Sequence, residues 1–269
     1  MRHSIGRICN FFGYSRQAYY QYRQRQLQSF IDEQLIISEI KQIRKRQSRV
    51  GGRKLHRMLH AKGFRVGRDK LFKLLRKHNL LVSPRKSFIK TTDSFHRFRK
   101  YKNLINDLTV TRADEVFVSD ITYIATQEGY CYLSLVTDVY SRKIVGYDVS
   151  ASLAIEGAQR ALQMALQHVV EPDRLIHHSD RGLQYCSNGY VKMLKERGVS
   201  ISMTEKNHCY ENSLAERVNG ILKDEFMLGE RLPSLSVVRK VVRQSIRIYN
   251  EERLHMSLDY QTPSMRYAA

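Results

Sequence analysis

The spacing of apolar residues changes once along the chain, near residue 114, and this change limits the folds open to it. Before that point apolar side chains recur at helical spacing, as at Leu35, Ile36 and Ile40. After it come three strand-like runs in sequence, followed by helix, strand, helix, strand and helix. This order predicts an α/β fold with a mixed five-stranded sheet, preceded by an all-α region.

Positive charge is concentrated in the amino-terminal part. Residues 1–110 contain 27 Lys and Arg against 6 Asp and Glu, a net charge of +21, whereas residues 111–269 contain 19 against 20. Charge of one sign gathered in this way indicates a polyanionic partner such as double-stranded DNA, because each neutralised phosphate releases counterions. A solvated basic surface or a ribosome-type extension is the alternative.

Several other classes of protein are not expected. No run of about eighteen apolar residues occurs, so no membrane span is predicted. The first residues lack the apolar core of a secretory signal, which makes the cytoplasm the expected compartment. Cys9, Cys131, Cys186 and Cys209 are too far apart to indicate a zinc ribbon or a disulfide framework.

The helical region divides into two modules. Residues 1–47 are expected to break at Gly13, to continue in a helix capped by Ser15, and to end in a longer helix from about Asp32 to Arg46. Residues 48–82 have the pattern of a helix-turn-helix, although a small helical bundle would give the same pattern. The rest of the chain is predicted as a basic linker at 83–111, a folded core at 112–230 and a helical tail at 231–269.

The second helix of the 48–82 module carries basic side chains outside its buried leucines. If this helix enters a major groove, its first turn faces bases and its last turn faces phosphates. His56 and His60 have the spacing of metal ligands on a helix, but the chain has no CxxC pair, so a zinc site is not expected. The basic residues of this module expected to contact DNA are Arg53, Lys54, Arg68, Lys70, Lys73, Arg76 and Lys77.

Three acidic residues occupy positions at which chemistry could use them. Asp120 interrupts an apolar strand, Asp180 ends the fourth strand, and Glu216 lies on a predicted helix. A strand centre, the end of a neighbouring strand and a helix packed across them can bring three carboxylates together. Each residue alone also has an ordinary explanation, as a turn partner, a helix cap or a surface residue.

Clustered carboxylates repel one another and persist only where cations neutralise them. Oxygen ligands suit Mg²⁺ or Mn²⁺. Two such ions, about 4 Å apart, can activate an attacking hydroxyl and stabilise a leaving oxygen in an in-line phosphoryl transfer. The sequence pattern is therefore compatible with a metal-dependent enzyme that acts on phosphodiesters.

Several strings carry a resemblance to a known family. They are DITY at 120–123, HHSDRGLQY at 177–185, ISMTEKNHCYENSLAERVNGILKDEF at 201–226, YNEERLHMSLDYQTPSMRY at 249–267, and GGRKLHRMLHAKGFRVGRDKLFKLLRKHNL at 51–80. Together they resemble the orfB-type insertion-sequence transposases of copy-out, paste-in bacterial elements, which have a retroviral-integrase-like DDE core. The 35 residues between Asp180 and Glu216 also match that family.

The resemblance implies a ribonuclease-H-like core with Asp120, Asp180 and Glu216 as catalytic residues and ligands of two Mg²⁺ or Mn²⁺ ions. It also implies DNA contacts by Asn212, Asn219 and Lys223 on the catalytic helix. The implied activity is that of a DNA transposase, a polynucleotidyl transferase that cleaves at element ends and transfers strands by direct transesterification. A ribonuclease-H-fold nuclease or resolvase, and a non-catalytic DNA-binding regulator of transposition, are the alternatives.

The expected partners follow from the same family. They are double-stranded DNA at the element ends and at the target, further copies of this chain in a synaptic complex, and an upstream-frame protein or fusion. The expected location is the bacterial cytoplasm, in association with the nucleoid.

Three further residues have roles that the sequence leaves open or assigns only locally. Glu211 stands where the family commonly has Asp, and its part near the metal site is open. His178 has two interpretations, one as a residue that orients DNA or water and one as a structural histidine. Asp138, which matches a family aspartate, is interpreted as a structural turn residue because Ser141 and Arg142 follow it closely.

Overall fold

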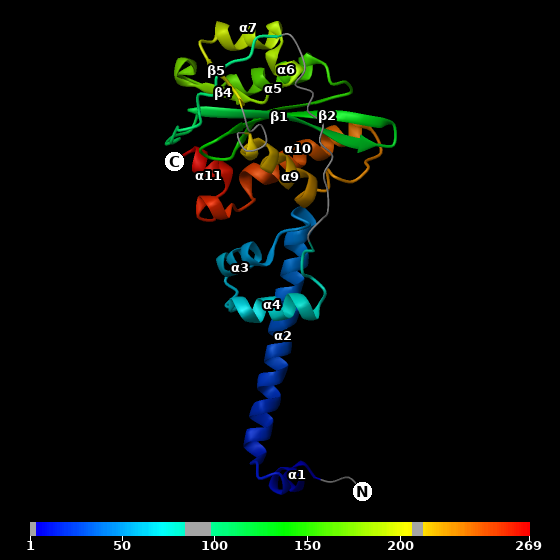
Figure 1. The fold of residues 1–269 in the computed structure, drawn as a ribbon. Coiled ribbons are helices and arrows are strands. Elements are labelled where there is room, and N and C mark those ends of the chain that lie inside the picture. Colours follow the sequence, from blue (N-terminus) through cyan, green and yellow to red (C-terminus); the bar gives the residue numbers. More distant parts are fainter. Residues whose placement is uncertain (1–3, 84–97, 206–211) are drawn as a thin grey trace. The chain divides into compact units, whose positions relative to one another are not determined.

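The computed structural model describes residues 4–83, 98–205 and 212–269, and the chain divides into two compact units. The first unit comprises Met1–Arg46 and Val50–Ser83, and the second comprises Gln47–Arg49 and Pro84–Ala269. Each unit has hydrophobic clusters of its own, and Figure 1 shows the helices and strands of both. Within the described ranges, no helix is long and apolar enough to cross a membrane.

The first unit is helical, as expected. The Ser15 hydroxyl accepts a hydrogen bond from Ala18 N at 3.0 Å, and Gly13 has a positive φ of 71° before it, so the predicted break and cap are confirmed. The prediction of two helices between residues 16 and 46 is wrong, because a single helix spans this stretch, which contains no Gly or Pro to interrupt it. The helices of the unit are α1 (Ile5–Phe11), α2 (Arg16–Arg46), α3 (Gly52–Ala61) and α4 (Arg68–Lys77).

The core of this unit joins the carboxyl-terminal half of α2 to α3 and α4. Ile40, Leu55 and Leu71 are fully buried in it. Gly63, with a positive φ of 88°, allows the turn between α3 and α4, and His60 Nε2 lies 2.8 Å from the Val66 carbonyl oxygen across that turn. His60 therefore has a structural hydrogen bond in the helix-turn-helix.

The second unit is built on a mixed five-stranded sheet, as predicted. The strand order is β3-β2-β1-β4-β5; the first three strands pair antiparallel, and β4 and β5 extend the sheet in parallel pairing. The strands are β1 (Val116–Thr126), β2 (Gly129–Asp138), β3 (Ile144–Ser150), β4 (Ile176–Ser179) and β5 (Ser200–Met203).

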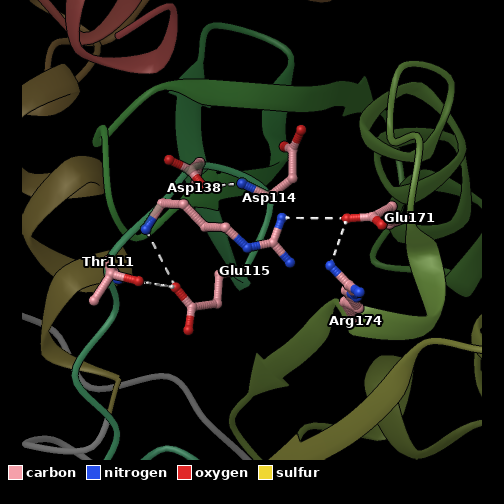
Figure 2. Close-up of polar contacts among 7 residues, drawn as sticks. Thr111, Asp114, Glu115, Asp138, Glu171 and Arg174 are labelled. Atoms are coloured by element: carbon pink, nitrogen blue, oxygen red, sulfur yellow. Dashed lines mark hydrogen bonds and ion pairs between the residues drawn. The ribbon is translucent and has the colours of Figure 1, made fainter.

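Side-chain carboxylates fix the approach to β1 and the turn after β2. Glu115 accepts a hydrogen bond from Thr111 N at 2.8 Å, and Asp138 accepts one from Asp114 N at 3.1 Å (Figure 2). Asp138 also accepts a hydrogen bond from Ser141 N at 2.7 Å and is fully buried. The interpretation of Asp138 as a structural turn residue is therefore confirmed.

Helices cover both faces of the sheet (Figure 1). One face packs against α5 (Ile155–Leu166), α6 (Leu183–Cys186) and α7 (Asn188–Glu196), and the other against α9 (Ser213–Glu225) and α10 (Leu235–Glu251). The short elements are η1 (Pro172–Arg174), η2 (Met256–Leu258) and α11 (Pro263–Tyr267).

Helix α10 belongs to the core of the second unit. Val238 and Val242 of α10 are fully buried in the same cluster as Ile124 of β1 and Leu133 of β2. The sequence predicts residues 231–269 as a helical tail, and its amphipathic helix α10 packs on the apolar surface that the sheet provides. The second unit accordingly includes this segment.

A buried ion pair ties the end of α9 to the segment after α10. Arg253, only 4% exposed, donates to both carboxylate oxygens of Glu225, at 2.8 and 2.6 Å. Its third nitrogen lies 2.9 Å from His255 Nε2. This bidentate pairing fixes the carboxyl-terminal end of α9.

Two glycines provide a matched test of the packing in the second unit. A Cβ at Gly146 in β3 would lie 2.1 Å from the Ala161 carbonyl oxygen of α5, whereas a Cβ at Gly220 in α9 would meet nothing within 4 Å. We expect Gly146→Ala to lower the free energy of unfolding by about 1–3 kcal/mol through overpacking. We expect Gly220→Ala to raise it by up to about 1 kcal/mol through helix propensity.

Urea unfolding followed by circular dichroism would measure both effects. Equal stabilities of the two variants would contradict the close packing of β3 against α5.

Candidate active site

The fold brings the elements that carry Asp120, Asp180 and Glu216 together. β1 and β4 are neighbouring parallel strands, and Ser119 pairs with Ser179. Asp120 and Asp180 are the residues that follow this pair on the two strands. Glu216 lies in the first turn of α9, which packs against β1. Asp180 and Glu216 both raise the pKa of Asp120, which places the three carboxylates within electrostatic reach of one another.

Asp120 has a strongly perturbed carboxyl. Burial raises the pKa of its carboxyl to about 7, and the neighbouring Asp180 adds to the increase. Two hydrogen bonds oppose this effect, from Asn219 Nδ2 at 2.7 Å and from Ile121 N at 2.9 Å. The carboxylate is thus fixed in orientation, while its surroundings still disfavour the charged form.

Asp180 and Glu216 differ in how they are held. Asp180 Oδ1 accepts a hydrogen bond from Gly182 N at 2.9 Å, as in a turn before α6. Glu216 is exposed, and partial burial together with Asp180 raises its pKa. Within residues 4–83, 98–205 and 212–269, no three or more His, Cys, Asp or Glu side chains are gathered so that they could hold a metal ion as they stand.

Two amides on α9 make hydrogen bonds to β1. Asn212 and Asn219 are 3% and 5% exposed. Asn212 donates to the Ser119 carbonyl oxygen at 3.1 Å, and Asn219 donates to Asp120. They face inward because the side of α9 that carries them packs on β1, and their predicted contacts with DNA stay a prediction.

Lys223 lies on the same helix with its side chain partly exposed. Its ammonium lies 4.4 Å from the centre of the Tyr123 ring. Burial lowers the pKa of Lys223, and the nearby Asp120 opposes that change. A cation is therefore available beside the carboxylates.

The two histidines before Asp180 are buried, and they contact different neighbouring side chains. His177 Nε2 lies 2.8 Å from Ser119 Oγ and 2.9 Å from the Tyr190 hydroxyl, and burial lowers its pKa to about 3. His178 Nδ1 lies 2.8 Å from Ser202 Oγ of β5. Both side chains join parts of the sheet and its helices. Glu211, the other open residue, lies outside the described residues.

Most of the basic residues predicted to contact DNA are exposed, with one exception. Lys54 is 9% exposed and lies beside the buried Leu55, on the side of α3 that packs in the core, so its predicted contact with DNA stays a prediction without an exposed side chain. Arg68 pairs with Asp69 at 2.9 Å, and Lys77 pairs with Glu33 at 2.7 Å. The exposed members of the predicted set in this unit are Arg53, Arg68, Lys70, Lys73, Arg76 and Lys77.

One residue near the carboxylates is not evident from the sequence. Tyr185 of α6 is 3% exposed, and Asp120 and Asp180 both contribute to raising the pKa of its hydroxyl. Its position five residues after Asp180 is the only sequence signal, and a buried aromatic residue in a helix is ordinarily a core residue.

The chain matches family models over most of its length. Residues 110–209 and 197–263 each match a model described as an integrase core domain, and residues 31–88 match an HTH-like domain. A helix-turn-helix unit joined to an integrase core is thus found by comparison as well as by the fold.

Similar proteins come from bacterial insertion sequences. The chain is 36% identical over 262 residues to the insertion element IS600 uncharacterized 31 kDa protein of Shigella sonnei, covering 96% of each chain. It is 33% identical to transposase InsF for insertion sequence IS3A of Escherichia coli K12, covering 78% of this chain and 73% of that protein. It is 30% identical to the transposase for insertion sequence element IS629 of Shigella sonnei, covering 80% and 72%.

One of two similar solved structures, with a TM-score above 0.5, supports the fold. A simian T-cell lymphotropic virus intasome in complex with PP2A regulatory subunit B56 gamma gives a TM-score of 0.51 at 15% identity, covering 82% of this chain and 72% of that one. The HTLV-2 integrase catalytic core domain in complex with magnesium gives a TM-score of 0.47 at 14% identity, covering 58% and 97%. The chain belongs to the family of orfB-type insertion-sequence transposases, enzymes with a ribonuclease-H-like integrase core.

The buried His177 makes stability depend on pH. Because its pKa falls from 6.5 to about 3 on folding, the unfolded chain binds a proton between these values that the folded chain does not. Stability from this group is therefore complete above pH 6.5 and is lost as the pH falls toward 3, by about 1.4 kcal/mol per pH unit. We expect His177→Gln to reduce the pH dependence of the free energy of unfolding, by at most about 1.4 kcal/mol per pH unit.

Urea unfolding at a series of pH values would measure the difference. Tyr190→Phe removes a hydrogen bond to the same imidazole but keeps the titrating group, so it should lower stability without changing the slope. A His177→Gln variant with the slope of the unmodified chain would contradict the assignment.

Proposed function

We propose that this transposase cuts DNA at the ends of its insertion element and joins the freed 3′ hydroxyl to another phosphodiester by direct transesterification. Asp120, Asp180 and Glu216 are the catalytic residues of this proposal. The observation that carries it is the buried Asp120, whose pKa is raised to about 7 by burial and then by Asp180, with Glu216 on the facing helix. A repelling set of acids at the edge of two parallel strands has no evident structural use.

Divalent cations fit this set of side chains. The donors are carboxylate oxygens only, and the repulsion between Asp120 and Asp180 favours bound positive charge, which suits Mg²⁺ or Mn²⁺ better than zinc. Asp120, Asp180 and Glu216 would hold two such ions. When bound, the ions supply positive charge to the attacking and the leaving oxygen of the phosphodiester.

The chain's own groups prepare the carboxylates for this task. Asn219 and the Ile121 N–H hold the two oxygens of Asp120, and the Gly182 N–H holds one oxygen of Asp180. Asn212 fixes the amino-terminal end of α9 on β1, and with it the turn that carries Glu216. Lys223 offers its ammonium to a DNA phosphate close to Asp120.

The helix-turn-helix of the first unit is proposed to bind the element end, with the exposed face of α4 on the DNA. The location proposed for this reaction is the bacterial cytoplasm, on nucleoid DNA. Pairing of two ends requires a second copy of the chain, and an upstream-frame protein or fusion is proposed as a further partner. Residues 48–82 are proposed as the DNA-binding module and 112–230 as the catalytic core.

Carboxylate substitutions test the reaction. Asp120→Asn, Asp180→Asn and Glu216→Gln should each lower metal-dependent strand transfer by at least about a hundredfold, because the ions lose a ligand. The measurement uses the full chain with a supercoiled plasmid that carries the element ends, with Mg²⁺, Mn²⁺ or Ca²⁺. Glu196→Gln, which removes an exposed carboxylate of α7, is the matched control and should retain activity.

Different outcomes would point elsewhere. Full strand transfer by any of the three variants would refute the assignment of that residue. Cleavage without joining by the unmodified chain would indicate a nuclease, and DNA binding that ignores both metal and carboxylates would indicate a regulator.

Basic substitutions test the DNA-binding face. Changing Lys70, Lys73 or Arg76 to Gln should weaken binding to the element end and reduce the slope of log affinity against log salt by about one for each phosphate that is no longer neutralised. Lys77→Gln is the comparison, because Lys77 is paired with Glu33 and should change the slope less. Fluorescence anisotropy at several salt concentrations measures both, and equal slopes in all variants would exclude α4 as the contact surface.

A further inference from the structure

Tyr185 presents a buried hydroxyl beside the catalytic carboxylates. The residue lies in α6, directly after the turn that Asp180 makes with Gly182. Its ring packs edge-to-face on Tyr190, with ring centres 5.3 Å apart, and its hydroxyl has no hydrogen-bond partner in the part of the chain that the structure describes. A buried hydroxyl without a partner bears the full cost of its lost hydration.

The neighbouring tyrosine shows what a structural hydroxyl looks like in the same cluster. Tyr190 is equally buried, and its hydroxyl lies 2.9 Å from His177 Nε2. A phenylalanine at position 185 would fill the same space against Tyr190 without the cost of an unbonded hydroxyl. Packing therefore explains the ring of Tyr185 but not its oxygen.

The two aspartates are the candidate hydrogen-bond acceptors for the Tyr185 hydroxyl. Burial, Tyr190, Asp120 and Asp180 all raise the pKa of the Tyr185 hydroxyl, so it keeps its proton and can only gain by donating it to an acceptor. Asp120 and Asp180 come from adjacent parallel strands, and Tyr185 follows Asp180 by a single turn of chain. Asp120 and Asp180 are thus two possible acceptors within electrostatic reach of this protonated donor.

We propose that Tyr185 is a positioning residue whose O–H donates a hydrogen bond to a carboxylate oxygen of the Asp120–Asp180 pair when these side chains close around divalent ions. This inference rests on the proposed function. Carboxylates that ligate a metal are themselves held by hydrogen bonds, and loss of such a bond typically weakens metal affinity or activity about 10- to 100-fold. The hydroxyl of Tyr185 would gain its acceptor as the two aspartates turn toward the ions.

Tyr185→Phe and Tyr190→Phe form a matched pair, because each removes one buried hydroxyl from the same aromatic cluster. Without metal, Tyr185→Phe should unfold at the same temperature as the unmodified chain or higher, whereas Tyr190→Phe should unfold lower. With Mn²⁺ titrated into the full chain, Tyr185→Phe should need about 10- to 100-fold more metal to reach its maximal rise in unfolding temperature. Tyr190→Phe should need the same concentration as the unmodified chain.

Strand transfer should follow the same pattern, with a higher Mg²⁺ requirement for Tyr185→Phe and a rate at saturating metal within a few-fold of normal. An unchanged metal requirement, or a metal-free Tyr185→Phe as destabilised as Tyr190→Phe, would overturn the inference. Asp120→Asn distinguishes failure of this inference from failure of the proposed function. If Asp120→Asn loses the rise in unfolding temperature with Mn²⁺ while Tyr185→Phe keeps it in full, only the role of Tyr185 fails. If the unmodified chain has no response to Mn²⁺, the proposed function fails and this inference with it.

Discussion

The parallel pairing of β1 with β4 is the constraint on which the site depends. Its register sets Ser119 opposite Ser179, so that the next residues, Asp120 in the middle of β1 and Asp180 just after β4, are neighbours. The two carboxylates repel there, and burial of Asp120 makes the repulsion stronger. Hydrophobic clusters on both faces of the sheet supply the free energy that holds this unfavourable pair in place. The carboxylate pair thus lowers the stability of the fold locally and strongly favours bound positive charge.

Helix α9 is fixed at both ends, and this explains how an exposed residue on it can be accurately placed. Asn212 ties its first turn to the backbone of β1, and Arg253 holds Glu225 at its last turn. Between these anchors, Glu216 remains exposed. The buried amides of Asn212 and Asn219 make hydrogen bonds within the protein.

The two units differ in the charged side chains that they carry. The first unit places a small apolar core under α4, whose exposed Lys70, Lys73 and Arg76 face solvent. The second unit carries the acids and their supporting amides. In the proposed function, binding of a polyanion and chemistry on its backbone demand opposite local charges, because basic groups around Asp120 and Asp180 would take the place of the proposed cations.

The sequence by itself determined the order of the sheet strands and most helices, because periodicity is a local signal, and it predicted the three acids from an Asp inside an apolar strand and from the family resemblance. It also predicted the Ser15 cap and the Asp138 turn, which depend on neighbours a few residues away. Only the tertiary structure decided that α2 is continuous, that α10 packs on the sheet, and that Lys54, Asn212 and Asn219 face inward. The sequence likewise did not indicate that Tyr185 lies near the aspartates. Burial is a property of surfaces that meet from distant parts of the chain, and residue type alone does not reveal which surfaces meet.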